Sequence, residues 1–436
     1  MFTSDCLNIN DKGHLTIGGV DTLELAARHG TPVLVMDEAQ VRANCRAYTS
    51  SIAQYYGGHG KALYASKAFS CKEICRIAQE EGLGLDVVSA GELYTALQVG
   101  FAPQHIYFHG NNKSPAELEY ALEAGVGFIV IDNLTEIGLL EDVAAKRGAA
   151  PQVPANVLLR IKPGVEAHTH EFIRTGQIDS KFGFALETGE AMQAARAVAQ
   201  TKHLSLVGIH CHIGSQIFDV APFELAAEIL LGFMAKVKAE LGIEMSQLNL
   251  GGGIGIKYLP DDNAPSYTVY FEHVARVIEQ QCAALDLTKP FLLLEPGRSI
   301  PGPAGITLYS VGNVKEIPDV RTYVAVDGGM GDNPRYMMYG AKYSMLNAAR
   351  PGEPATETYT IAGRYCESGD LLAEHTLVQP LQPGDVLAVL STGAYNYAMA
   401  SNYNRVPRPP VVIVRDGESR VIVRGETLED MARLDV

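Results

Sequence analysis

One stretch of this sequence, Ala62-Leu63-Tyr64-Ala65-Ser66-Lys67-Ala68-Phe69-Ser70, predicts a short buried strand that ends in a lysine. The strand is expected from Ala62 to Ser66, with Lys67 at its C-terminal end and a helix beginning near Cys71. An ε-amine desolvated in a pocket at that place could act as a nucleophile and form a Schiff base. A solvated surface lysine is the other interpretation, and this stretch alone favours it.

The same order of strand and helix recurs along the chain. Nine apolar, strand-like runs are expected, at Pro32–Asp37, Ala62–Lys67, Gly84–Ser89, Ile106–Gly110, Gly127–Asp132, Val157–Lys162, Leu206–Gly214, Leu248–Gly253 and Phe291–Pro296. Amphipathic helical stretches lie between them, such as Glu38–Tyr55, Cys71–Glu81, Ala90–Val99, Pro115–Ala124, Thr188–Gln200 and Ala221–Leu241. This alternation predicts parallel β/α units, and eight or nine of them in about 260 residues are typical of a closed (β/α)8 barrel. An open doubly wound sheet is the alternative, but its Gly-x-Gly-x-x-Gly motif does not follow the first strand.

The pattern changes after Pro303 to short β-branched runs separated by Gly, Pro and Asp. These runs are Gly305–Val314, Tyr323–Val326, Tyr359–Ile361, Val386–Val389, Pro410–Val414 and Ser419–Arg424. They predict an antiparallel β domain, which could also include the N-terminal strand His14–Ile17. We therefore expect a barrel over residues 32–302 and a β-barrel or sandwich domain made of residues 1–31 and 303–436.

The composition indicates a soluble enzyme that takes a small substrate. The chain has 436 residues, a 47% hydrophobic content and a formal net charge of −15, which makes nucleic acid and anionic membranes poor partners. Its seven cysteines are scattered and odd in number, unlike a disulfide framework. No apolar run near the start is typical of a signal peptide, and no stretch is long enough to span a membrane, so a cytoplasmic location is expected.

Functional side chains of a parallel barrel lie just beyond the C-terminal ends of its strands. Asp86, Glu92 and His109 are expected in such positions. Each also has an ordinary structural interpretation, because Asp86 and Glu92 could cap a helix and His109 could be a satisfied core histidine.

The run His210-Cys211-His212-Ile213-Gly214-Ser215-Gln216 places two histidines on one face of a strand. They could be metal ligands, but no acidic residue is near them to complete a set. Alternatively, one imidazole could stack on an aromatic cofactor while Ser215 donates to a phosphate. Gly251-Gly252-Gly253 follows the next strand, and its exposed N–H groups would suit phosphate oxygens, although a tight turn gives the same pattern.

Glu295-Pro296-Gly297-Arg298 ends the last expected barrel strand. A buried glutamate facing a heteroaromatic nitrogen would favour the protonated ring, which is the better electron sink. Gly297 and Arg298 could bind a phosphate or a carboxylate. An amine, an imidazole, a serine, three glycines and a carboxylate beside an arginine together predict a pocket for pyridoxal 5′-phosphate.

The C-terminal region holds a second set of polar residues. Arg335 offers a carboxylate-binding fork, with Tyr339 four residues further on. Cys366-Glu367-Ser368-Gly369-Asp370 combines a thiol with acidic neighbours, and Gly393-Ala394-Tyr395 follows it. A lone cysteine is usually a small core residue, but this polar turn favours a proton-donor role for Cys366.

Taken together, these motifs resemble the diaminopimelate decarboxylase family, whose members are barrel-fold enzymes dependent on pyridoxal phosphate. The motifs, in chain order from about residue 30 to 415, are Tyr64-Ala-Ser-Lys67-Ala, His210-Cys-His212-Ile-Gly-Ser215-Gln, Gly251-Gly-Gly253, Glu295-Pro-Gly-Arg298, Cys366-Glu-Ser-Gly-Asp370 and Gly393-Ala-Tyr395. The segment from Thr169 to Gly183 resembles the family's active-site lid. Two positions depart from the family pattern, which are Phe69 in place of a common Asn and Arg364-Tyr365 in place of Pro-x before the cysteine.

The resemblance implies a role for each residue. Lys67 would hold the cofactor covalently, His212 would stack on its ring, and Glu295 would bind its pyridine nitrogen. The implied phosphate pocket consists of Ser215, Gly252, Gly253, Gly297 and Arg298. The implied substrate-binding residues are Arg298, Arg335, Tyr339, Glu367 and Tyr395, the last of which would also touch the cofactor.

The implied reaction is the decarboxylation of meso-2,6-diaminopimelate to L-lysine and CO₂, the last step of lysine biosynthesis. Cys366 would donate the proton to Cα in the partner subunit's site, which would make a homodimer obligatory. The nearest alternative is a related decarboxylase acting on arginine, ornithine or carboxynorspermidine. A racemase, which lacks the Cys-Glu motif, and a catalytically inactive regulator of the same fold are more distant alternatives.

Overall fold

The computed structural model describes residues 2–147, 154–165 and 180–436. The chain forms two compact units, which are built from several segments each. One consists of residues 1–44, 256–263 and 298–436, and the other consists of residues 45–255 and 264–297. The first division falls inside helix α2 (Glu38–Tyr56). Within the described residues, no helix has both the length and the apolar character needed to cross a membrane.

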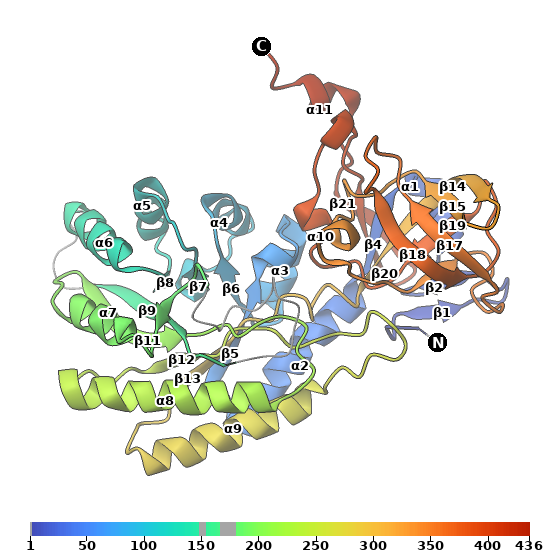
Figure 1. Cartoon of the computed structure of the whole chain (residues 1–436). Helices are drawn as coiled ribbons and strands as arrows, with labels where there is room; N and C mark the ends of the chain where they lie inside the picture. Colours follow the sequence, from blue (N-terminus) through green and yellow to red (C-terminus); the bar gives the residue numbers. More distant parts are fainter. Residues whose placement is uncertain (1, 148–153, 166–179) are drawn as a thin grey trace. The chain divides into compact units, whose positions relative to one another are not determined.

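The second unit is a closed barrel of eight parallel strands (Figure 1). In chain order the strands are β5 (Gly60–Ala65), β6 (Gly84–Val87), β7 (Ile106–Phe108), β8 (Phe128–Ile131), β9 (Ala155–Lys162), β11 (Leu204–His210), β12 (Gln247–Asn249) and β13 (Phe291–Leu294). Pairing of β8 with β9 and of β13 with β5 closes the ring, and a two-residue strand, β10 (Phe184–Ala185), adds to β9. The predicted barrel is confirmed.

The helices that follow the barrel strands in the chain lie outside the ring (Figure 1). They are α3 (Lys72–Glu80), α4 (Ala90–Leu97), α5 (Pro115–Glu123), α6 (Leu134–Lys146), α7 (Glu190–Ala199), α8 (Ala221–Leu241) and α9 (Tyr267–Ala284). Side-chain caps fix where several begin, since Ser89 accepts from the backbone N–H of Glu92 and Ser114 forms a capping box with Glu117. Strand residues such as Leu63, Leu158 and Leu293 form a shared apolar core.

The first unit is built mainly from β structure. Its largest sheet has the order β18–β17–β15–β14–β4–β20–β21, and β19 pairs with both β14 and β16. The strands are β4 (Val33–Asp37), β14 (Gly305–Ile317), β15 (Arg321–Val326), β16 (Met345–Asn347), β17 (Glu357–Ala362), β18 (Leu371–Val378), β19 (Val386–Val389), β20 (Val411–Arg415) and β21 (Glu418–Val423). Most pairs are antiparallel as predicted, but β15 with β17 and β20 with β4 are parallel.

The N-terminal residues belong to this β unit. Strands β1 (Leu7–Ile9), β2 (Leu15–Ile17) and β3 (Val20–Asp21) form a small antiparallel sheet, followed by helix α1 (Thr22–His29). Leu15 and Ile17 pack with Ile306 and Val412 in one core. The unit also contains the short helices α10 (Arg335–Tyr339) and α11 (Leu428–Ala432).

One strand lies elsewhere than expected. Eight of the nine predicted runs are the barrel strands, but Pro32–Asp37 corresponds to β4, which lies between β14 and β20 in the β unit. All five residues of β4 are buried. A buried central strand of the β unit and a buried barrel strand are both short runs of apolar residues. The pattern of apolar residues alone therefore cannot distinguish them.

Candidate functional site

Lys67 follows the C-terminal end of a barrel strand, as predicted. Strand β5 ends at Ala65, and Ser66–Ala68 form a short 3₁₀ turn. The backbone N–H of Ala65 donates to the carbonyl of Pro296 at 3.0 Å, which ties this strand end to the one that carries Glu295. The Lys67 side chain is exposed, so the desolvation expected for its amine is not observed in the protein alone.

Glu295 is the centre of a buried polar cluster at the same end of the barrel. The carboxylate lies just past β13 and is 7% exposed. His210 Nε2 lies 3.0 Å from Oε2, and because a carboxylate only accepts, this nitrogen carries the donated proton. The amide of Asn249 donates to Oε1 at 2.7 Å, and His109 Nε2 lies 2.8 Å from the same oxygen.

These contacts fix the charges of the cluster. Burial acts to raise the pKa of Glu295, but His109 and His210 outweigh it and hold that pKa well below its usual range. Burial lowers the pKa of His210 to about 4, which leaves this imidazole neutral. For His109, burial is outweighed by the charges of Glu295 and Asp86, and its pKa is raised. The cluster therefore keeps an ionised carboxylate in a buried site.

Asp86 and Glu92 have different surroundings. Asp86 is buried in β6, where burial raises its pKa to about 6, and its Oδ1 lies 3.9 Å from His109 Nε2. The helix-capping interpretation of Asp86 is therefore wrong. Glu92 does act in helix capping, since its carboxylate accepts from the backbone N–H of Val88 at 2.8 Å in front of α4.

The same cluster bears on the metal-site alternative. The sequence places no acidic residue beside His210 and His212, but the fold brings Glu295 to His210. Among the described residues, His109, His210 and Glu295 form a group whose ligand atoms lie within 4.8 Å of one another. Their 2.8 and 3.0 Å contacts are those of ring nitrogens binding a carboxylate directly. Among the described residues, His109 Nε2 and His210 Nδ1 nevertheless have no hydrogen-bond partner, so the cluster retains unsatisfied buried nitrogens.

The glycines after β12 pack tightly on neighbouring strand ends. A Cβ on Gly252 would lie 2.1 Å from the carbonyl oxygen of Glu295, and one on Gly253 would lie 2.5 Å from that of Gly214. Gly253 also has a φ of +121°, which strongly favours glycine. Only glycine fits these two positions.

Polar groups of the neighbouring loop lie against this turn. The backbone N–H of Gly252 donates to His212 Nδ1 at 3.3 Å. Burial, and next the positive charge of Lys67, hold the pKa of His212 well below its usual range, so the ring is neutral. Ile217 exchanges backbone hydrogen bonds with Gly253 and Gly255, which joins the loop of Ser215 to the glycine turn.

This donor set fits pyridoxal 5′-phosphate. The exposed amine of Lys67, the ionised Glu295 and the neutral ring of His212 all lie at the C-terminal ends of barrel strands. The glycine turn leaves no side chain between the backbone and an approaching phosphate. The chemistry agrees with an aldehyde cofactor whose ring nitrogen needs an anionic partner.

The other predicted residues lie in the β unit, where two arginines share one phenol. Tyr258 Oη accepts from Arg298 Nη1 at 2.6 Å and from Arg335 Nη1 at 2.9 Å. Arg335 Nη1 also donates to Tyr343 Oη at 2.7 Å, and Tyr343 donates to the side-chain oxygen of Asn396 at 3.1 Å. The guanidinium carbon of Arg298 lies 4.8 Å from the ring centre of Tyr395.

The remaining candidates of this unit are more accessible. Tyr339 ends α10 and is partly buried. Cys366 and Glu367 lie in an exposed turn, where the backbone N–H of Cys366 donates to the side chain of Asn404 at 2.8 Å. Most of the segment that resembles a lid falls in residues 166–179, outside the described residues.

Sequence reasoning missed Asn249, Tyr258, Tyr343 and Asn396. Asn249 had a usable signal, because it is a polar residue at the end of a barrel strand, two residues before Gly251. In the structure its side-chain oxygen accepts from the Gly251 N–H at 2.9 Å. Asn396 is adjacent to the predicted Tyr395. No local pattern marks Tyr258 or Tyr343 as partners of two arginines, since both become so only through the fold.

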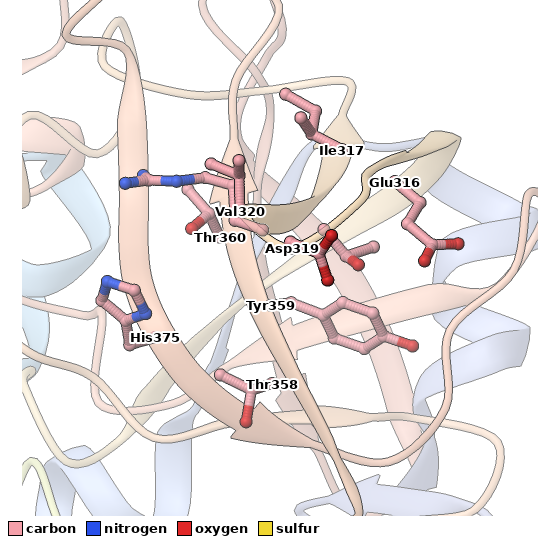
Figure 2. A pocket seen from close by; sticks show the side chains of 10 residues that line it. Glu316, Ile317, Asp319, Val320, Thr358, Tyr359, Thr360 and His375 are labelled. Atoms are coloured by element: carbon pink, nitrogen blue, oxygen red, sulfur yellow. The ribbon is translucent and has the colours of Figure 1, made fainter.

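The β unit also has a hollow that holds none of the predicted residues (Figure 2). Its volume is about 320 Å³. It is lined by Glu316, Ile317, Asp319, Val320, Arg321, Thr322, Thr358, Tyr359, Thr360 and His375. None of the predicted catalytic, cofactor-binding or substrate-binding residues therefore lines this hollow.

Comparison with known proteins gives a consistent family. Residues 38–302 match the family described as pyridoxal-dependent decarboxylase, pyridoxal binding domain. The chain is 49% identical to diaminopimelate decarboxylase of Bacillus subtilis (strain 168), over 100% of this chain and 98% of that protein. It is 45% identical to the Staphylococcus aureus (strain COL) enzyme of the same name, with 97% of each covered. The crystal structure of the M. jannaschii enzyme in co-complex with L-lysine is 35% identical, with a TM-score of 0.93 over 100% of this chain and 99% of that one.

Proposed function

The chain belongs to the diaminopimelate decarboxylase family of pyridoxal-dependent enzymes, and we propose that the barrel-end cluster around Lys67 and Glu295 is its active site. The reaction is the decarboxylation of meso-2,6-diaminopimelate to L-lysine and CO₂. When bound, pyridoxal phosphate accepts the electron pair that remains on Cα as CO₂ departs. The observation that carries this proposal is the buried, ionised Glu295 beside a strand end that presents a lysine amine.

Each residue of the proposed cofactor site has a defined task. Lys67 holds the cofactor through its amine, and the neutral ring of His212 covers the cofactor ring. Glu295 keeps the pyridine nitrogen protonated, because an ionised carboxylate favours a cationic partner. The residues that bind the phosphate are Ser215, Gly252, Gly253, Gly297 and Arg298.

The test of the function is CO₂ release from separate substrates. The holoenzyme is incubated with meso-diaminopimelate, ornithine or arginine, and L-lysine formation is measured alongside. We expect release from diaminopimelate at a rate far above the other two. Preferential release from ornithine or arginine would replace this function with that of a related decarboxylase.

Substrate choice follows from the charges of the β unit. The distal end of diaminopimelate carries a carboxylate and an ammonium group, which need a cation and an anion respectively. We propose Arg335, together with Arg298, for the carboxylate and Glu367 for the ammonium group. Tyr339 and Tyr395 complete the proposed binding residues. Ornithine lacks the distal carboxylate, so it would leave the buried charge of Arg335 without its anion.

Replacing Arg335 with alanine is therefore expected to raise the KM for diaminopimelate about a hundredfold, or roughly 2.7 kcal/mol, with a smaller change in kcat. Steady-state CO₂ release measures both constants. Arg321→Ala removes the same charge from an arginine of this unit that pairs with Glu374 at the surface, and it should leave both constants unchanged. Unchanged kinetics in Arg335→Ala would remove this residue from the substrate site.

Replacing Glu295 with glutamine is expected to lower kcat by about 10²- to 10³-fold. Glutamine keeps the volume but removes the negative charge that stabilises a protonated ring nitrogen and raises the pKa of His109. Rapid-quench measurement of CO₂ release from enzyme saturated with cofactor isolates this effect from cofactor loss. A kcat within threefold of wild type would argue against contact between Glu295 and the ring nitrogen.

We further propose that the protein acts in the cytoplasm as a homodimer, without nucleic acid. All seven cysteines are free, which suits a reducing compartment, and the net charge of −15 disfavours nucleic acid. The run Cys366 to Gly369 is exposed in the single chain, which supports its use at the site of a second subunit.

A further inference from the structure

Tyr258 lies where two positive charges of the β unit converge. The side chains of Arg298 and Arg335 are 7% and 9% exposed, and both donate to the single oxygen of Tyr258. Among the described residues, no carboxylate lies within ion-pair distance of Arg335. Two buried guanidinium groups repel each other, so a shared acceptor between them lowers the cost of holding them together.

The hydrogen-bond pattern distinguishes this phenol from its neighbour Tyr343. Tyr343 accepts from Arg335 and passes its own proton to Asn396, so it has both a donor and an acceptor partner. Tyr258 accepts from two groups that can only donate. The oxygen of Tyr258 therefore occupies the position, between two guanidinium groups, that an anionic ligand would occupy.

We propose that Tyr258 is a positioning residue for substrate recognition. It holds Arg298 and Arg335 side by side through its hydrogen bonds, and these bonds are replaced when a substrate carboxylate binds the two arginines. This inference rests on the proposed function of the two arginines and adds the group that orients them. A ligand with a carboxylate finds both guanidinium groups already in place, whereas a ligand without one gains nothing from them.

The ionisation of the phenol then opposes carboxylate binding. Burial acts to raise the pKa of Tyr258, but the two arginines outweigh it and lower that pKa from its ordinary value. The other titratable groups that face Tyr258 are Tyr343, whose pKa burial raises to about 12, and Asp262, which binds the backbone N–H of Tyr258. As the pH rises through the pKa of Tyr258, the phenolate binds the arginines more tightly and competes with a carboxylate for them.

The test uses a pair of ligands that differ by one carboxylate. L-lysine retains the distal carboxylate, and 1,5-diaminopentane is the same molecule without it. Their dissociation constants for the holoenzyme are measured by calorimetry from neutral pH to about pH 10. We expect the preference for L-lysine to fall at least tenfold over this range in the wild-type protein, and a preference that does not change with pH would overturn the proposal.

Two variants separate positioning from simple loss of a hydrogen bond. In Tyr258→Phe, we expect affinity for L-lysine to drop about tenfold near neutral pH, affinity for 1,5-diaminopentane to stay within twofold, and the pH dependence of the preference to disappear. In Tyr343→Phe, L-lysine affinity should also drop, but the pH dependence should remain. The ammonium groups of the two ligands titrate in the same way whichever protein is present. The difference between the pH profile of the wild-type protein and that of Tyr258→Phe therefore reports on Tyr258.

The outcomes also separate this inference from the proposed function. A wild-type protein that releases no CO₂ from meso-diaminopimelate contradicts the function. A wild-type protein that decarboxylates diaminopimelate while Tyr258→Phe keeps the wild-type ligand preference and pH profile contradicts only the role of Tyr258. If Tyr258→Phe does not fold, the pH dependence of the wild-type preference that remains after correction for the ammonium pKa values of the two free ligands decides the question.

Discussion

Replacing Lys67 with alanine should reduce the rate of CO₂ release from meso-diaminopimelate by at least about a thousandfold. Catalytic residues that act together lose most of their rate enhancement when the nucleophile among them is removed. The variant should also lose the visible absorbance of covalently held pyridoxal phosphate after gel filtration. Its fold should be retained, since the Lys67 side chain is exposed and leaves no cavity in the core.

Lys72 provides a matched control for this variant. It is an exposed lysine at the first position of α3, five residues further along the same segment. Lys72→Ala removes the same charge from the same region and should retain both activity and absorbance. Loss of both properties in Lys72→Ala, or their survival in Lys67→Ala, would contradict the assignment of the amine.

The barrel strands could be predicted because each is short, apolar and bounded by turn residues. Strand β13, Phe291–Leu294, is a clear case, since three of its four residues are fully buried and polar residues begin directly after it. Parallel topology then predicts that Lys67, His210 and Glu295 share one end of the barrel. Strand β4 has the same apolar pattern in a different sheet, so its partners could not be derived from the sequence.

The partners of the predicted residues were harder to derive than the residues themselves. A buried glutamate could be expected at position 295, but its contact with His210 joins residues 85 positions apart in the chain. Tyr258 is harder still, because residues 256–263 belong to the β unit although barrel sequence precedes and follows them. Contacts of this kind depend on how distant segments pack, and local residue patterns carry no information about them.

The expected effect of replacing Cys366 with alanine is a 10²- to 10⁴-fold loss of L-lysine formation, roughly the contribution of a general acid. The cofactor should stay bound, because Cys366 is not among the residues that we propose to bind it. Ser368→Ala, two residues further along the same exposed turn, is the matched control and should leave turnover unchanged. Normal L-lysine formation in Cys366→Ala would remove the proton-donor role.

The proposed homodimer makes a sharper version of this experiment possible. If Cys366 of one subunit serves the Lys67 site of the other, mixing Lys67→Ala with Cys366→Ala subunits gives hybrid dimers with one intact site each. Random exchange should then restore about a quarter of wild-type activity from two inactive proteins, since half of the dimers are hybrids and each has one intact site out of two. If Cys366 instead serves the site of its own subunit, every site in the mixture lacks one of the two residues. Activity that stays at background after proven subunit exchange would therefore place the proton donor within the same chain.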